Sequence, residues 1–115
     1  MVRVSFYREG RALRGFEASG HAGFAAEGSD VVCAAVSAVL LTALHGIQAV
    51  VGAQPRTVRR DGRGYLRVVI PRTAGVQTSR DAALILGVAF AGLRRIAAEY
   101  PGTVRLDIKK RRKNQ

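Results

Sequence analysis

The chain has 115 residues, the length of one domain with a single modest core, and its 19 basic and 8 acidic side chains give a formal charge of +11. A single cysteine excludes an internal disulfide, and the first ten residues contain no apolar signal segment, so we expect an intracellular, cytoplasmic protein. The excess of positive charge calls for an acidic partner or a solvated basic segment.

The first half of the sequence predicts a hairpin followed by a long helix. Apolar and polar residues alternate over residues 2–7, which is typical of a strand with one buried face, and a turn at residues 9–10 leads into a second strand that ends near Ser19. Asp30 is placed to cap a helix that runs to about Val51.

The second half repeats this order and adds a strand. Residues 57–60 and 65–70 predict a hairpin, Ser79 is placed to cap a second helix that stops before Pro101, and residues 104–108 form a last strand with alternate apolar residues inward. The order ββαββαβ predicts an α/β fold. It is a two-layer sandwich in which a mainly antiparallel sheet carries two helices on one face.

The domain is expected to comprise residues 1–108, with residues 109–115 as a basic, disordered tail. Five basic residues stand together at 109–113, and no aromatic residue for base stacking is interleaved with them. Such a run is typical of a solvated segment, so we expect at most weak, salt-sensitive contact with nucleic acid through it.

Both predicted helices are apolar nearly all round, whereas a helix on a two-layer sheet needs only one apolar stripe. Self-association is the simplest way to bury the remaining apolar surface of the helices, so we expect a homodimer. Residues 31–53 lack any charge over a length that could span a bilayer. They are rich in alanine and carry several polar residues, among them His45, so we favour a core helix and no membrane.

The only cysteine, Cys33, is the third residue of its predicted helix, where free amides and the helix dipole favour a thiolate. His21 lies on the preceding glycine-rich loop, which can fold back over the helix start. The pair is therefore a candidate nucleophile and general base, with loop amides to hold an oxyanion. The alternative is a small buried thiol without a chemical role, and the residues alone leave both open.

Other residues in this segment carry less chemistry. Asp30 is expected to fix the start of the helix, since its charge would oppose a thiolate at Cys33. Ser37, one turn further, is either a packing residue or a support for the site. His45 stands twelve residues from Cys33, about 18 Å along a helix, so the two cannot share a metal, and we expect no metal and no cofactor.

Two stretches resemble a known family. The segment "GHAGFAAEGSDVVCAAVSA", residues 20–38, resembles the signature of the ribosomal-processing cysteine proteases called Prp, and "FAGLRRIAAEYPGTVRLDI" resembles that family's last helix and strand. Phe24 and Val31 depart mildly from the signature. The resemblance implies that His21 and Cys33 form a catalytic dyad, accompanied by Gly20, Asp30 and Ser37.

The resemblance also implies an activity. Members of this family remove a short amino-terminal extension from the large-subunit ribosomal protein L-twenty-seven, act as homodimers and carry a mobile loop over the active site. The same role here would fall to residues 20–29. Within this loop, the expected gating residues are Ala22, Gly23, Phe24 and Gly28. The expected reaction is attack of the Cys33 thiolate on a peptide carbonyl, through an acyl-enzyme. A non-enzymatic ribosome- or RNA-associated protein is the alternative that the charge supports.

Overall fold

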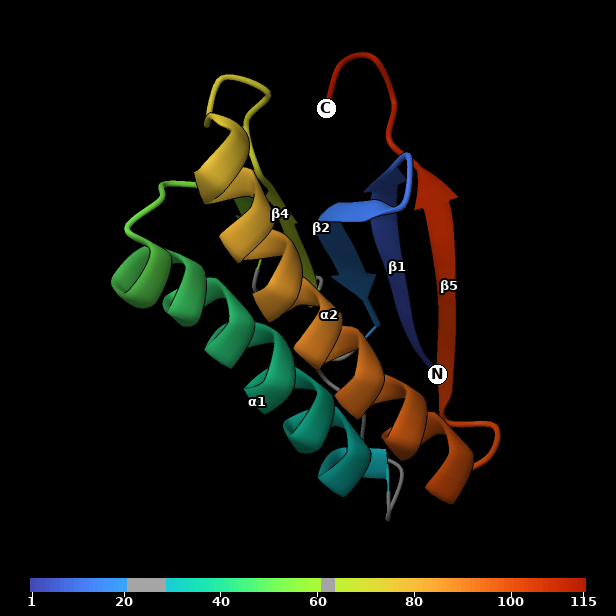
Figure 1. Ribbon diagram of the computed structural model, residues 1–115. Helices are drawn as coiled ribbons and strands as arrows, with labels where there is room; N and C mark the ends of the chain where they lie inside the picture. The colour runs from blue at the N-terminus through green and yellow to red at the C-terminus, as the bar shows by residue number, and fades with distance from the viewer. Residues whose placement is uncertain (21–28, 61–63) are drawn as a thin grey trace.

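A computed structural model describes residues 1–20, 29–60 and 64–115, without the side chains of residues 29 and 30. It has two layers: a five-stranded sheet, and two long helices that lie side by side on one face of that sheet (Figure 1). The elements in chain order are β1 (Val2–Glu9), β2 (Ala12–Ser19), α1 (Ser29–Gly46), its π-helical continuation η1 (Ile47–Val51), β3 (Arg56–Arg60), β4 (Tyr65–Val69), α2 (Val76–Glu99) and β5 (Val104–Lys110).

The strands are arranged in the order β3-β4-β2-β1-β5. The β1/β2, β2/β4 and β3/β4 pairs are antiparallel, and β5 pairs with β1 in parallel. A parallel pair needs a crossover, and α2 supplies it across the helical face of the sheet. The predicted two-layer α/β sandwich, with a mainly antiparallel sheet and both helices on one face, is confirmed.

The core lies between the sheet and the helices. Phe6 and Phe16 face each other across β1 and β2 with ring centroids 5.7 Å apart, and Phe90 of α2 meets Phe6 edge-on at 5.2 Å. Edge-on aromatic contacts of this kind stabilise a core beyond the area that they bury. The largest fully buried side chains are Phe6, Phe16, Leu40, Ile47, Ile70, Leu86, Leu93, Val4, Val32, Val36 and Val68.

The segment Val31–Val51 is long and apolar enough to cross a membrane by length and composition alone. In the fold, one side of this helix supplies the core with Val36, Leu40 and Ile47, whereas Val50 is 82% exposed. The buried side accounts for part of its apolar composition as an ordinary core helix does.

Both helices begin earlier than their capping residues predicted. α1 starts at Ser29, so Asp30 lies inside its first turn, and α2 starts at Val76 rather than after Ser79. Gly75 precedes α2 with a φ of +88° and provides no side-chain cap. The amide of Ser79 already donates a helical hydrogen bond to the carbonyl of Gly75 at 3.1 Å, which places Ser79 within the helix.

The carboxyl-terminal segment also differs from its prediction as a disordered tail that begins at residue 109. β5 continues to Lys110, because its register beside β1 runs on until Lys110 pairs with Arg8. Arg111 is only 6% exposed, and its amide donates to the carbonyl of Arg8 at 2.7 Å. The folded domain therefore extends beyond residue 108.

Candidate active site

Cys33 is the fifth residue of α1 and lies at the end of its first turn. Its side chain is 8% exposed and belongs to the apolar core cluster between helix and sheet. The thiol is free of any disulfide. Cys33 thus lies close to the helix start, as the sequence predicted, although the helix begins two residues further upstream.

Gly20 follows directly on the end of β2 and has a φ of +78°, a left-handed conformation that favours glycine. It turns the chain out of the strand just before His21. The end of β2 and the start of α1 lie toward the same end of the molecule, the lower end in Figure 1. The loop between them, with His21, Ala22, Gly23, Phe24 and Gly28, lies outside the described residues.

Ser37 stands one turn beyond Cys33 on α1 and is half-buried, so it shares the side of the helix on which the thiol lies. The backbone of Asp30 is helical, and its side chain lies outside the description. His45 is exposed near the end of the same helix, far from Cys33. Within residues 1–20, 29–60 and 64–115, no three histidine, cysteine or carboxylate side chains gather as metal ligands.

A polar hollow of about 560 Å³ lies on the other face of the sheet, away from the helices, and the sequence analysis missed it. Its lining residues come from four strands: Arg3, Ser5, Glu17, Ser19, Tyr65, Arg105, Asp107 and Lys109. They are the polar members of alternating strands, since Val2 and Val4 face the core while their neighbours face outward. That alternation was the available signal.

Glu17 organises this hollow. The hydroxyl of Tyr65 donates to its carboxylate at 3.0 Å, and the Lys109 ammonium lies 3.9 Å from its other oxygen. Burial, followed by the hydrogen bond to Glu17, raises the pKa of Tyr65. The tyrosine therefore remains a neutral hydrogen-bond donor at physiological pH. The hollow extends as far as Ser19, the residue directly before Gly20.

The described part of the site offers a cysteine in no disulfide near a helix start, a half-buried serine one turn beyond it, and a strand end that leads into the loop of His21. A thiol in that position suits covalent catalysis, provided that a base reaches it.

Residues 1–105 match the protein family described as cysteine protease Prp. The ribosomal processing cysteine protease Prp of Bacillus subtilis is 28% identical over 107 residues, which cover 92% of this chain and 96% of the relative. The protein of the same name from Staphylococcus aureus strain Mu50 is 33% identical over 91 residues, 78% of this chain and 81% of the relative.

Solved structures agree with these matches. The crystal structure of the essential ribosomal processing protease Prp from S. aureus, in complex with a substrate peptide, superimposes with a TM-score of 0.83 at 26% identity, over 95% of this chain and 100% of that one. A Streptococcus mutans protein has the same fold, with a TM-score of 0.86 at 23% identity over 96% of both chains.

Proposed function

The chain belongs to the Prp family of cysteine proteases, and from this premise we propose that Cys33 and His21 form its catalytic dyad. The observation that carries the proposal is the position of Cys33, which lies near the start of α1, the helix that follows the glycine-rich loop of His21. Family membership makes the chain an enzyme, so the non-enzymatic alternative is set aside.

The reaction follows from the chemistry of the two side chains. His21 accepts the thiol proton, and the Cys33 thiolate attacks the peptide carbonyl to give a tetrahedral oxyanion. The amide N–H groups of the helix start and the loop stabilise that oxyanion. The C–N bond then breaks, His21 returns the proton to the leaving amine, and water hydrolyses the acyl-enzyme. No cofactor enters these steps.

Local backbone supports this arrangement. Gly20 takes the left-handed conformation directly after β2, which turns the chain out of the strand. We assign Asp30 to the helix start and Ser37 to support of the site. Residues 20–29, including Ala22, Gly23, Phe24 and Gly28, are assigned to the loop that gates the substrate.

The substrate we propose is a ribosomal protein precursor, the large-subunit protein L-twenty-seven with its amino-terminal extension. Two facts support this choice: the curated relatives are named ribosomal processing proteases, and the S. aureus structure holds a substrate peptide. A precursor of this kind places the enzyme in the cytoplasm, with Val31–Val51 as a core helix and not a membrane span.

We further propose that the enzyme is a homodimer. An apolar groove of about 570 Å³ runs between α1 and α2 on the outer side of the helical layer. Val50 and Val88, which line it, are 82% and 75% exposed. Apolar side chains this exposed are rare on the surface of a monomer, and a second copy of the same helices would cover them.

The test uses a peptide that copies the junction between the extension and the mature precursor. The wild type should cut it once, Cys33→Ala should abolish cleavage while peptide binding persists, and His21→Ala should lose about a hundredfold or more. Cys33→Ser should be nearly inactive, because a hydroxyl is a poorer nucleophile near neutral pH.

The matched control is His45→Ala, an exposed change near the end of α1 and outside the apolar groove, which should cleave at the wild-type rate. A second readout is alkylation, since Cys33 should react with iodoacetamide faster in the wild type than in His21→Ala. Cleavage by Cys33→Ala at the wild-type rate would exclude the dyad.

A further inference from the structure

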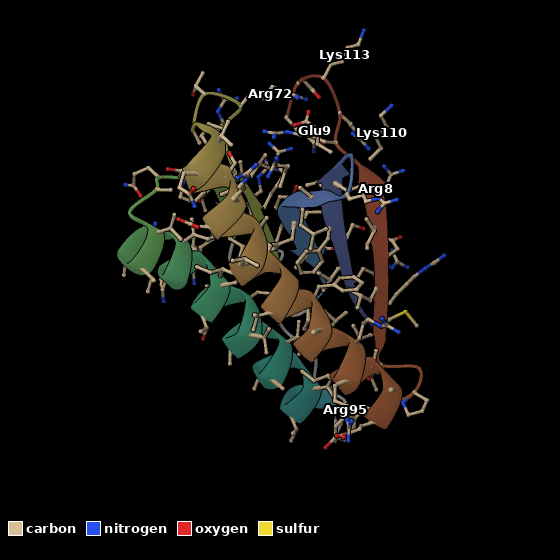
Figure 2. All side chains as sticks on the ribbon, viewed as in Figure 1. Arg8, Glu9, Arg72, Arg95, Lys110 and Lys113 are labelled. Atoms are coloured by element: carbon tan, nitrogen blue, oxygen red, sulfur yellow. The ribbon has the colours of Figure 1, made fainter. Side chains whose placement is uncertain are left out.

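Three separate segments of the chain bring basic side chains to one end of the molecule, the end opposite the start of α1 (Figures 1 and 2). They are the turn between β1 and β2 with the residues beside it (8–14), the connection from β4 into α2 (70–80), and the carboxyl-terminal residues 110–115. Together these segments hold nine basic residues and one carboxylate, Glu9. We call the nine the basic pole: Arg8, Arg11, Arg14, Arg72, Arg80, Lys110, Arg111, Arg112 and Lys113.

Glu9 ties the three segments together. Its carboxylate pairs with Arg72, and the guanidinium nitrogens of Arg14 and Arg111 lie 3.8 Å and 3.9 Å from it. The hydrogen bond from Arg72, aided by the charges of Arg72, Arg111 and Arg14, lowers the pKa of Glu9, so the carboxylate stays ionised at physiological pH. One anion thus holds three arginines near one another.

Backbone contacts fix the same geometry. Arg72 donates to the carbonyl of Arg112 at 2.9 Å, and Arg14 donates to the carbonyl of Ser79 at 3.3 Å. Arg111 donates to the carbonyl of Ile70 and, at 2.8 Å, to the backbone oxygen of Gln115. The basic pole is therefore a folded surface and not a flexible tail, which lowers the entropy cost of binding a partner.

The remaining positive charge points outward. Six members of the basic pole are exposed and, among the described residues, form no pair with a carboxylate: Arg8, Arg11, Arg80, Lys110, Arg112 and Lys113. The polar hollow on the open sheet face differs, because Glu17 and Asp107 there offset its three basic residues. The pole thus carries much more unbalanced positive charge than the hollow does.

The residue types in the basic pole indicate which kind of anion it would bind. Its arginines match phosphate oxygens, to which a guanidinium can donate in a bidentate manner. The three segments contain no aromatic residue on which an unpaired base could stack. A surface of this kind recognises a backbone of regularly spaced phosphates and does not read bases.

We propose that the basic pole binds the phosphodiester backbone of duplex RNA, and the choice of RNA over DNA rests on the proposed ribosomal substrate. The molecule is 43 Å long, and Cys33 lies near the opposite end. RNA held at the pole leaves the active-site end open. The enzyme would be retained beside a precursor that is itself in contact with RNA.

The test measures binding of a short labelled RNA duplex by fluorescence anisotropy between about 50 and 200 mM salt. The pole variant carries Arg11→Gln, Arg80→Gln and Lys113→Gln, three exposed changes that leave the Glu9 contacts intact. Its affinity for the RNA duplex should be lower than that of the wild type by about tenfold or more. The slope of log affinity against log salt concentration should also be smaller, by the equivalent of about three phosphate contacts.

The matched control removes the same charge elsewhere, with Arg94→Gln, Arg95→Gln and Arg105→Gln; Arg95 lies at the other end of the molecule in Figure 2. It should keep wild-type affinity. The pole variant should cleave the junction peptide like the wild type, so the outcome for RNA is separate from the outcome for the proposed protease. Equal weakening in both variants would show that net charge and not the pole binds RNA.

Two further arms decide the identity of the anion. A DNA duplex of the same sequence should bind more weakly, and equal affinity would overturn the assignment to RNA. Vesicles of phosphatidylserine and phosphatidylcholine should not retain the protein at concentrations that saturate RNA. If the vesicles retain the wild type but not the pole variant, the pole is a membrane-binding surface and the proposal is wrong.

Discussion

Gly15 on β2 lies so close to Val68 on β4 that a Cβ atom added to the glycine would stand 2.3 Å from the Val68 carbonyl oxygen. The neighbouring Cα of Val69 would be 2.9 Å away. All of these atoms belong to the backbone of a paired strand, which cannot move aside as a flexible side chain can. The pairing of β2 with β4 thus requires glycine at position 15.

Gly15→Ala should therefore destabilise the protein by about 2–3 kcal/mol or more, because β2 and β4 must separate to accept the methyl group. The matched change is Gly87→Ala in α2, where a Cβ meets nothing within 4 Å. There alanine should stabilise by about 0.5–1 kcal/mol through its helix propensity. Urea denaturation of both variants checks the pair, and equal effects would contradict the close approach.

Arg111→Ala should destabilise the fold by about 1–3 kcal/mol, because it leaves the carbonyl of Ile70 without its donor and removes one cation from Glu9. The guanidinium is held out of water, since the Arg111 side chain is only 2% exposed, and this burial, followed by the charge of Arg72, lowers the pKa of Arg111. Exposed Arg112→Ala should change stability by less than about 0.5 kcal/mol. Chemical denaturation separates the two, and no difference would mean that the carboxyl-terminal turn is not packed.

Stability should fall in alkaline solution because of Tyr7. Burial raises the pKa of Tyr7 to about 12, an effect that its hydrogen bond with Gln115 offsets in part and that Glu17 increases. The folded state thus holds the phenol proton more tightly than the unfolded state, whose tyrosine ionises near 10. The contribution is complete below pH 10 and is lost as the pH rises toward 12.

Tyr7→Phe removes this group and should flatten the loss of stability over the same alkaline range. The measurement is the urea midpoint as a function of pH for both proteins. Tyr100→Phe is the control, since Tyr100 is 47% exposed and its change should leave the wild-type slope. Parallel curves for the wild type and Tyr7→Phe would show that Tyr7 ionises freely in the folded protein.

Val88→Glu should dissociate the proposed homodimer. It places a charge in the apolar groove between α1 and α2, and desolvation of that charge should weaken association by about a hundredfold or more. Val76→Glu, at a residue 71% exposed but outside the groove, adds the same charge and should leave the dimer intact. Sedimentation velocity checks both, and a wild type that is monomeric at tens of micromolar would contradict the homodimer.

Local patterns were sufficient to predict the strands and the layers. Alternation in β1 placed Val2, Val4 and Phe6 inward, and all three are buried. The starts of the helices were less accurate, because the prediction assumed a capping side chain where Gly75 opens α2 through its backbone conformation alone. A glycine that begins a helix gives little sequence signal.

The carboxyl-terminal segment shows the limit more clearly. A run of basic residues predicts a solvated tail when only neighbours in sequence are considered. Here Arg111 is buried because Glu9 and Ile70, far away in sequence, lie beside it in the fold. The polar hollow was missed for the same reason, since its residues come from four strands. For the site, the position of Cys33 was predicted, while the pairing with His21 stays a prediction.

The two outer strands of the sheet, β3 and β5, leave one backbone edge each without a partner strand in the described fold. Exposed edges of this kind invite another sheet to add on and begin aggregation. β3 carries Arg56, Arg59 and Arg60 along its five residues, and β5 ends in Lys109 and Lys110. Two copies that approach edge to edge would bring like charges together. The arginines and lysines of the outer strands thus protect the protein from forming continuous sheets, while the apolar groove between α1 and α2 stays available for a specific partner.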